Sequence, residues 1–322
     1  MSVHPFPAPA SPAEAVRRFE LTLSRRIDGL IHGDHTGRLV GLGTEPGETR
    51  RYAPGDDPRR IDWNVTARTR VPHVRDSVAD HELTTWLVVD LTASQHFGTA
   101  RCTKRQLVEM TAGALAVLAS RGGNKVGAVL LTSDGVVTVE PKAGHLHLMA
   151  LFHKLLSAPS ADGAGPDLGA ALGRLGRPHI RPGLVVVVSD FPSSGTWHPA
   201  LRLLAARHET LAVEVLDPRE LELPDVGLLT VVDAESGEER DVATGDAGLR
   251  RRFAALARER REATAATLRG AGVDHVVLRT DRDAVADLVG WLARRPHRLA
   301  AMRRARAAHP AGAGRRARTG VG

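Results

Sequence analysis

Cysteine is almost missing from this chain of 322 residues, which holds a single one, Cys102. No disulfide can form within the chain, and a zinc site built on several cysteines is excluded. Long apolar runs are missing too: runs such as "WLVVDL" and "GLVVVV" have the length of strands, whereas a membrane-spanning helix needs about 20 apolar residues. The first residues, "MSVHPFPAPASP", lack the basic start and apolar core of a signal peptide. These absences predict a cytoplasmic protein.

Lysine is scarce as well, because only four of the 44 basic residues are lysine and the rest are arginine. The formal net charge of +7 is spread unevenly, since the segment from Arg294 to the end holds nine arginines and no acidic residue. The body of the chain is therefore close to neutral, which does not fit a uniformly basic domain that binds a specific nucleic acid. For the tail, the composition leaves two readings open: a disordered solubilising segment, or contact with an acidic partner or membrane surface.

Shifts in composition predict five parts along the chain. The Pro-rich start is predicted to be disordered, and the letters "SPAE" that follow have the pattern of a helix N-terminus. A Gly-, Thr- and Arg-rich stretch with short alternating pieces, including "RIDWNVTA" and "PHVRDS", predicts a small β-rich subregion. The predicted parts are a disordered N-terminus at 1–10, a helix at 11–32, the β-rich subregion at 33–83, an α/β domain at 84–296 and a basic disordered tail at 297–322.

Strands and helices alternate through the predicted α/β domain, which is typical of a mainly parallel central sheet. Within it, "TTWLVVDL" and "GLVVVVSDF" are continuous apolar runs of the kind found in strands buried on both faces. Ligands of such folds bind outside the carboxyl ends of the strands. The oxygen-bearing side chains at these strand ends, and at the start of a short helix between them, are Asp90, Thr92, Ser94, Asp190 and Asp167.

These side chains predict a site for a hard cation. Asp90, Thr92 and Ser94 stand at alternate positions and so project the same way toward one point. Carboxylate and hydroxyl oxygens suit Mg²⁺ or Mn²⁺. The open alternative is a turn in which the same side chains only cap backbone groups.

Two family resemblances rest on these motifs. Asp90-x-Thr92-x-Ser94, "GPDLGAAL" and "VVVVSDF" resemble the metal-ion-dependent adhesion site of the von Willebrand factor A fold. The run "RRYAPGDDPRRIDWNVTARTRVPHVRD", followed by "LVVDLTAS", resembles the bacterial domain-of-unknown-function 58 family, and the resemblance extends over residues 20–295. It implies a von Willebrand A-like α/β domain, with a mainly parallel sheet flanked by helices and a small β-rich subregion before the first core strand.

The second resemblance also implies partners, but no established activity. Members of the family typically accompany MoxR-type AAA+ ATPases and other von Willebrand A-domain proteins, in the assembly or maturation of complexes. One residue departs from the adhesion-site pattern, because Pro166 stands where that site usually has Thr. One ligand of the usual set is then missing, and Asp167 is the candidate to replace it.

The stretch "YAPGDDPRRIDW", residues 52–63, joins a Pro-Gly turn to paired charges and a tryptophan. Its carboxylates and arginines can pair in forked geometry, and Ile61 and Trp63 would point the same way in a strand. A stapled turn, a docking surface for a partner or domain, and a catalytic loop are all open. The candidates for docking are Asp56, Asp57, Arg59, Arg60, Asp62 and Trp63.

Catalytic signatures are scarce. The sequence has no Gly-x-Ser-x-Gly elbow, no Gly-Lys-Ser/Thr phosphate loop and no His-Glu-x-x-His zinc motif. A phosphatase of the haloacid dehalogenase type needs Asp where this chain has Thr92. The sequence therefore predicts a non-enzymatic protein-binding or assembly factor that acts with a MoxR-type ATPase through a Mg²⁺-dependent adhesion-type site. Its alternatives are a metal-independent scaffold that docks through the Arg/Asp-rich loop, and a metal-dependent phosphatase-like enzyme.

Overall fold

The fold comes from a computed structural model of the full chain. The structure describes residues 12–33, 49–52, 61–75, 83–159, 163, 165–192, 196–233 and 236–293. The predicted N-terminal and C-terminal disordered segments lie outside these residues. So does most of the Arg/Asp-rich loop, including Asp56, Asp57, Arg59 and Arg60.

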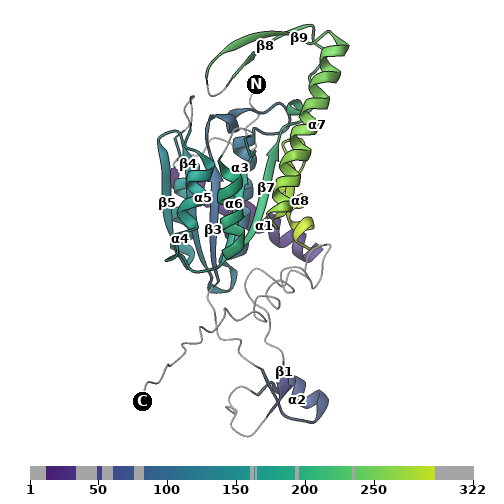
Figure 1. Ribbon diagram of the computed structural model, residues 1–322. Helices are drawn as coiled ribbons and strands as arrows, with labels where there is room; N and C mark the ends of the chain where they lie inside the picture. The colour runs from purple at the N-terminus through teal and green to yellow at the C-terminus, as the bar shows by residue number, and fades with distance from the viewer. Residues whose placement is uncertain are drawn as a thin grey trace, which may run out of the picture.

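A six-stranded sheet forms the centre of the part of the chain that the structure describes (Figure 1). Its strands stand in the order β10-β7-β6-β3-β4-β5, and among them only β5 runs antiparallel to its neighbour. This arrangement confirms the predicted fold class, a mainly parallel central sheet flanked by helices. The strands are β3 Thr84–Asp90, β4 Lys125–Thr132, β5 Gly135–Lys142, β6 Leu184–Ser189, β7 Glu209–Leu216 and β10 Asp274–Arg279.

Helices cover both faces of this sheet, which explains why the central strands contain nearly continuous apolar runs. In β3, Leu87 packs into the core on one face, and its neighbour Val88 packs into the core on the other. The first face is covered by α1 Pro12–Gly33, α3 Lys104–Ser120, α4 His145–Leu156 and α8 Ala284–Ala293. The second is covered by α5 Leu168–Leu175, α6 Trp197–Arg207 and α7 Ala247–Gly270. None of the helices in the described ranges combines the length and apolar content needed to cross a membrane.

The N-terminal helix α1 belongs to the α/β domain and not to a separate part. It buries Val16, Phe19, Leu23 and Ile27, a helical spacing that places all four on one face. The ring of Phe19 meets that of Phe152 in α4 edge-on, with the ring centroids 5.3 Å apart. Close approach of α1 to α3 requires Gly113, because a Cβ there would lie 2.5 Å from the ring of Phe19. The helix predicted at 11–32 corresponds to α1, but the sequence does not predict that this helix packs against the first face of the sheet.

A hairpin and a long helix project beyond the sheet (Figure 1). Strands β8 Leu228–Val232 and β9 Glu239–Ala243 pair antiparallel and stand between β7 and α7 in the chain. Figure 1 shows the hairpin beside the N-terminal end of α7, away from the six-stranded sheet. Together, β8, β9 and the first half of α7, residues 247–258, are referred to below as the arm.

The described part of the predicted β-rich subregion holds one strand pair with a helix between its strands. Strand β1 Thr49–Arg51 pairs antiparallel with β2 His73–Arg75, and α2 spans Trp63–Thr69. The prediction that "RIDWNVTA" is a strand is therefore wrong, although the strand predicted within "PHVRDS" is present as β2. The physical reason is Asp62, whose carboxylate accepts hydrogen bonds from the amides of Asn64 and Val65 and so starts a helix.

Two carboxylates precede α8, and only one of them caps the helix. The carboxylate of Asp281 pairs with Arg279. Asp283 performs the capping role, because its Oδ1 accepts a hydrogen bond of 3.1 Å from the amide of Ala286.

Candidate functional site

The candidate site lies where the strand order of the sheet reverses. The chain leaves β3 toward β4 on one side, and later returns on the other side to form β6 and β7. β3 and β6 are parallel neighbours, so their carboxyl ends meet at one edge. Folds of this kind bind ligands at such an edge. Asp90 ends β3, while Ser189 ends β6 and is followed by Asp190.

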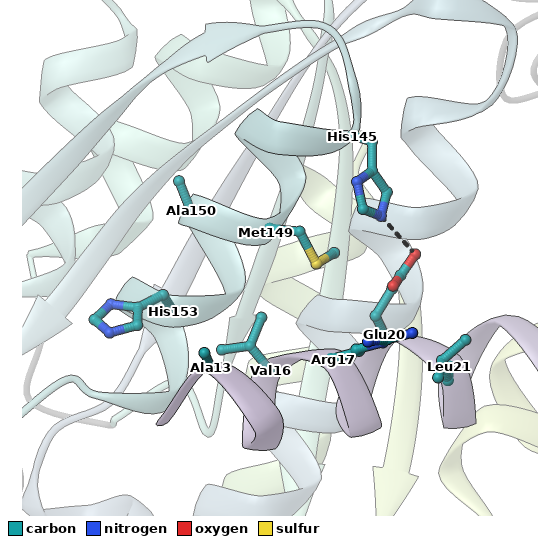
Figure 2. A pocket seen from close by; sticks show the side chains of 9 residues that line it. All are labelled: Ala13, Val16, Arg17, Glu20, Leu21, His145, Met149, Ala150 and His153. Carbon is teal, nitrogen blue, oxygen red and sulfur yellow. Dashed lines mark hydrogen bonds and ion pairs between the residues drawn. The ribbon is translucent and has the colours of Figure 1, made fainter. Parts of the chain in front are cut away.

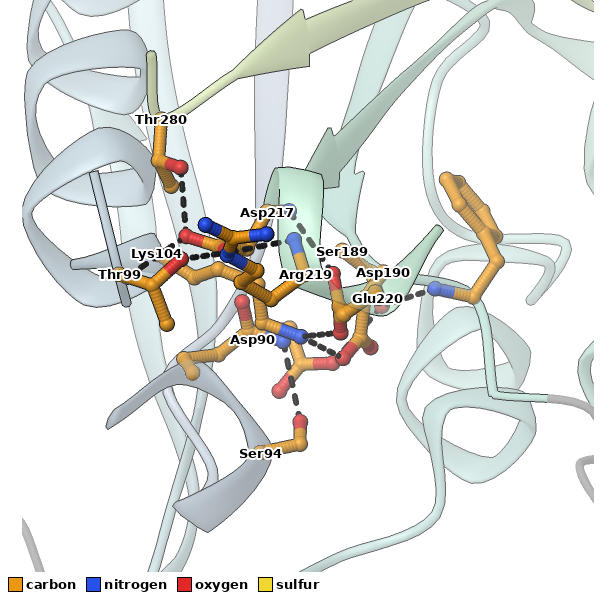
Figure 3. Close-up of polar contacts among 12 residues, drawn as sticks. Asp90, Ser94, Thr99, Lys104, Ser189, Asp190, Asp217, Arg219, Glu220 and Thr280 are labelled. Atoms are coloured by element: carbon orange, nitrogen blue, oxygen red, sulfur yellow. Dashed lines mark hydrogen bonds and ion pairs between the residues drawn. The ribbon is translucent and has the colours of Figure 1, made fainter. Parts of the chain in front are cut away.

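Asp90 is buried at this edge and both of its carboxylate oxygens accept hydrogen bonds (Figure 3). Oδ1 accepts from the hydroxyl of Thr92 at 2.6 Å and from its amide at 3.2 Å. Oδ2 accepts from the hydroxyl of Ser189 at 2.7 Å. Burial, and next the negative charge of Asp190, raise the pKa of Asp90, while the hydrogen bonds oppose that rise. The two carboxylates therefore share one poorly solvated place, as the sequence predicts.

Lys104, the first residue of α3, reaches into the same place, and nothing in the sequence analysis identifies it. Its ammonium nitrogen lies 2.7 Å from Oδ2 of Asp190 and 2.7 Å from Oε1 of Glu220 (Figure 3). The residue is 1% exposed. Burial works against its charge, yet the two carboxylates raise the pKa of Lys104 above its ordinary value. The pKa of Asp190 is correspondingly lowered, because the charge and hydrogen bond of Lys104 outweigh the burial that would raise it.

Glu220 is oriented by the short helix that carries it. This 3-10 helix, η4, spans Pro218–Glu220 and is closed by a reciprocal cap. Oε2 of Glu220 accepts from the amide of Asp217 at 2.8 Å, which leaves Oε1 for Lys104. Asp217 is itself fully buried and accepts from the hydroxyls of Thr99 and Thr280 at 2.5 and 2.7 Å. The loop after β7 is therefore tied to the start of α3 and to the end of β10.

The other predicted ligands divide into two groups. The hydroxyls of Thr92 and Ser94 lie 3.4 Å apart beside Asp90, so the structure brings these three predicted residues together with Asp190. Asp167 is exposed and is used as the N-cap of α5, where it accepts from the amide of Ala170 and from the hydroxyl of Thr196. These contacts hold Asp167 in a capping role outside the Asp90–Asp190 group.

The loop in front of Asp167 nevertheless packs against the group. A Cβ added at Gly165 would lie 2.4 Å from Cγ2 of Thr92, so only glycine permits this approach. Pro166 follows directly and brings no hydroxyl to the edge.

Of the predicted docking residues, only Asp62 and Trp63 fall within the described ranges. The carboxylate of Asp62 is engaged in capping α2, which accords with the stapled-turn reading of this residue. Trp63 is 70% exposed, so it remains available for contact with another surface. The docking hypothesis for the loop as a whole stays a prediction.

In the observed arrangement, these side chains do not fit Mg²⁺. Both oxygens of Asp90 accept hydrogen bonds, and one oxygen of Asp190 is held by the ammonium of Lys104. The other oxygen, Oδ1 of Asp190, is buried without a hydrogen bond of normal geometry, so it is the one carboxylate oxygen of the pair that is not already engaged. Among the described residues, no group of three or more His, Cys, Asp or Glu side chains could hold a metal ion. Binding of Mg²⁺ or Mn²⁺ stays a prediction that a binding measurement has to test.

The sequence of the chain matches a known protein family. A family described as "Protein of unknown function DUF58" matches residues 48–263. The chain belongs to the DUF58 family. The matched segment includes the whole edge cluster, meaning Asp90, Thr92, Ser94, Lys104, Ser189, Asp190, Asp217 and Glu220.

Similar proteins from mycobacteria carry the description "Uncharacterized protein". Proteins of Mycobacterium tuberculosis strain H37Rv and of Mycobacterium bovis are each 48% identical over 284 residues, covering 88% of this chain and 89% of theirs. A protein of Mycobacterium avium is 42% identical over 155 residues, 48% of this chain and 91% of its own.

Solved structures that are similar to the chain include von Willebrand A domains. BatB from Bacteroides thetaiotaomicron is 12% identical, with a TM-score of 0.43, over 68% of this chain and 99% of its own. The von Willebrand A domain of SpRpn10 is also 12% identical, with a TM-score of 0.39, over 65% of this chain and 94% of its own.

Two hollows in the described surface lie near the elements discussed. A groove of about 730 Å³ runs between α1 and α4 and is lined mainly by apolar side chains; at its rim, His145 Nε2 lies 3.2 Å from Oε1 of Glu20 (Figure 2). A cavity of about 280 Å³ adjoins the edge cluster, since Asp190 and Glu220 line it together with residues of α7 such as Phe253 and Leu256. The second cavity connects the edge cluster to the arm.

Proposed function

We propose that this DUF58 protein is a non-enzymatic protein-binding factor, which docks a MoxR-type AAA+ ATPase through the arm and the adjoining edge of the sheet. The choice of partner rests on the family resemblance described for the sequence. The observation that carries the docking surface is the exposure of large apolar side chains on the arm. Leu228 is 68% exposed, Val232 is 60% exposed and Leu256 is 65% exposed.

These side chains are arranged for contact with another protein. Leu228 and Val232 are four residues apart on β8, so they stand on the same face of the strand. Within the described residues, β8 pairs only with β9, which leaves its other edge open. Concentrated apolar exposure on a projecting element is typical of a protein-interaction site, and open strand edges accept additional strands.

Charges on the arm favour a partner surface of mixed sign. The first half of α7 carries Arg250, Arg251, Arg252 and Arg258, and β9 carries Glu239 and Asp241 beside Arg240. Arg250 is engaged within the chain, because it donates to the carbonyl of Thr244 and pairs with Asp225. The remaining three arginines suit an acidic patch on the partner, and complementary charge of this kind chiefly speeds association and sets its orientation.

The edge cluster supports a binding role over a catalytic one. It contains no histidine or cysteine, and its lysine is held charged between two carboxylates. Neither an imidazole nor a neutral amine is therefore available in the cluster to act as a general base. The cluster instead fixes the loop after β7, which precedes the arm.

Isothermal titration calorimetry with the MoxR-type ATPase of the same organism tests this proposal. The variant Leu228→Asp/Val232→Asp is expected to weaken binding at least about tenfold, which corresponds to a loss of ~1.4 kcal/mol. Leu146→Asp is the matched control, because Leu146 is 85% exposed but lies on α4. Melting temperatures of all variants should match the wild type, since the substituted side chains are exposed.

Equal affinity of the arm variant and the wild type would refute docking through the arm. The same titration examines the metal-independent alternative, in which the Arg/Asp-rich loop docks the partner. If that loop is the docking surface, Arg59→Glu abolishes binding and the arm variant does not. Absence of any binding by the wild type would remove the MoxR-type ATPase as the partner.

A further inference from the structure

The edge cluster already contains a cation, because Lys104 brings its ammonium to the carboxylates. The contact to Asp190 joins residues 86 positions apart, and the contact to Glu220 joins residues 116 positions apart. The three residues come from the start of α3, the end of β6 and the loop after β7. The ammonium therefore holds together three segments that only the folded chain brings into contact.

The choice of lysine at this position is informative. Only four of the 44 basic residues of the chain are lysine, so arginine supplies nearly every other positive charge. Lys104 is nevertheless the largest charged side chain with less than 2% exposure in the described residues. A compact ammonium can donate in several directions from one point, whereas a planar guanidinium needs more room and a forked acceptor. The site thus takes a compact positive charge that reaches two carboxylates from one atom.

The charges around Lys104 agree with this role. A buried carboxylate without a counter-ion carries a large desolvation cost. Lys104 is the counter-ion of Asp190, and its ammonium also contacts the carboxylate of Glu220. A divalent ion at Asp190 would have to stand beside this ammonium and be repelled by it. The two cations compete for the same carboxylate.

We propose that Lys104 is the resident cation of the edge cluster and takes the place that a divalent metal holds in an adhesion-type site. The edge is then formed without Mg²⁺ or Mn²⁺, and its shape does not respond to the free metal concentration. The ammonium is buried and donates to Asp190 and Glu220 of the same chain, so it offers no open coordination position to a partner's carboxylate. This inference concerns the cluster itself and stands whether or not the arm docks an ATPase.

Thermal unfolding of the full chain in excess EDTA, in Mg²⁺ and in Mn²⁺ tests the proposal. The wild type is expected to melt at the same temperature in all three conditions. Lys104→Met keeps an unbranched side chain but removes the charge, so Asp190 and Glu220 lose their counter-ion. Its melting temperature should fall by about 10 °C in EDTA. Part of that loss should return in Mg²⁺ or Mn²⁺, because the vacated place then accepts a divalent ion.

Metal rescue separates a resident cation from a merely structural lysine, since loss of packing alone would not be repaired by a divalent ion. Lys154→Met is the matched control, because Lys154 is exposed on α4 and its replacement should change neither stability nor metal response. The proposal is overturned if Lys104→Met folds but shows no gain from either metal.

Calorimetry of the wild type with Mg²⁺ and Mn²⁺ provides a second test that does not depend on folding of a variant. No saturable binding is expected. Saturable binding that Asp190→Asn abolishes would overturn the proposal and would establish the adhesion-type metal site predicted from the sequence. A loss of ATPase binding in the arm variant has no bearing on either result, so failure of the two proposals can be told apart.

Discussion

Asp217 is the buried member of the edge cluster that ties the loop after β7 to Thr99 and Thr280, and its replacement tests these hydrogen bonds. The carboxylate accepts from the amides of Thr99 and Arg219 at 2.8 and 2.9 Å, and from the hydroxyls of Thr99 and Thr280. Asp217→Ala leaves both amides without an acceptor, whereas the hydroxyls can rotate toward others. Each stranded amide costs about 1–3 kcal/mol, so the free energy of unfolding should fall by about 4 kcal/mol. Asp217→Asn keeps one oxygen and should cost about 2 kcal/mol.

The effect of Asp217→Asn should depend on pH in a defined direction. Burial alone would raise the pKa of Asp217, but the hydrogen bonds from Thr99 and Thr280 outweigh it and hold the pKa below its ordinary value. A group with a lowered pKa in the folded state stabilises the protein above its unfolded pKa of about 3.9. That contribution is lost as the pH falls through the folded value. The difference between wild type and variant should therefore be constant above about pH 5 and shrink below about pH 4.

Urea unfolding followed by tryptophan fluorescence measures these differences, because Trp86 and Trp197 are both buried in the core on the second face of the sheet. Asp134→Asn is the control: Asp134 is exposed between β4 and β5, and its replacement should stay within about 0.5 kcal/mol. Equal stability of Asp217→Asn and wild type at neutral pH would refute the reasoning. A stability gap that persists unchanged in acid would refute the assigned pKa direction.

Two further substitutions test packing near the edge. Gly165→Ala should destabilise the protein by about 1–3 kcal/mol, because the new Cβ would meet Cγ2 of Thr92 at 2.4 Å. Gly173→Ala in α5 is the control, since its Cβ meets nothing within 4 Å and should stabilise the protein by ~0.5–1 kcal/mol. Equal effects of the two substitutions on chemical denaturation would contradict this reasoning. Trp197→Ala should cost about 3–5 kcal/mol, since the ring is 1% exposed, whereas Trp63→Ala, at 70% exposure, should lie within about 0.5 kcal/mol of wild type. A large loss for Trp63 would show that α2 packs against another surface.

Much of the fold follows from local sequence pattern. Strands buried on both faces are nearly continuous apolar runs, so "WLVV" and "LVVVV" identify β3 and β6 without knowledge of their neighbours. The carboxyl ends of parallel strands share an edge, which predicts that Asp90 and Asp190 lie at the same edge, and the resemblance to the adhesion site implies that they belong to one site. Local pattern fails where a short side chain competes with it. "RIDWNV" alternates like a strand, yet the carboxylate of Asp62 captures two amides and begins α2.

The cation of the edge cluster could not be predicted in the same way. Lys104 is the first residue of a helix, where a lysine is ordinarily solvated, and its partners lie 86 and 116 positions further along the chain. Glu220 stands in a three-residue helix whose cap turns its carboxylate inward. No spacing rule links these residues, because the link depends on how the loop after β7 folds over the strand ends. The sequence shows that lysine is scarce, but only the structure shows that one of the four lysines, Lys104, lies between two carboxylates.

The hairpin of the arm is closed at its base. The amide of Gly245 donates to the carbonyl of Gly227 at 3.0 Å, and the hydroxyl of Thr244 donates to the same carbonyl at 2.9 Å. The chain thus leaves for the hairpin and returns from it at one point, so its strands can be lengthened, shortened or exchanged without a change in the register of the sheet. Under the docking role proposed for the arm, recognition and scaffold are separable: two chains with the same six strands and the same edge cluster could select different clients by their hairpins alone.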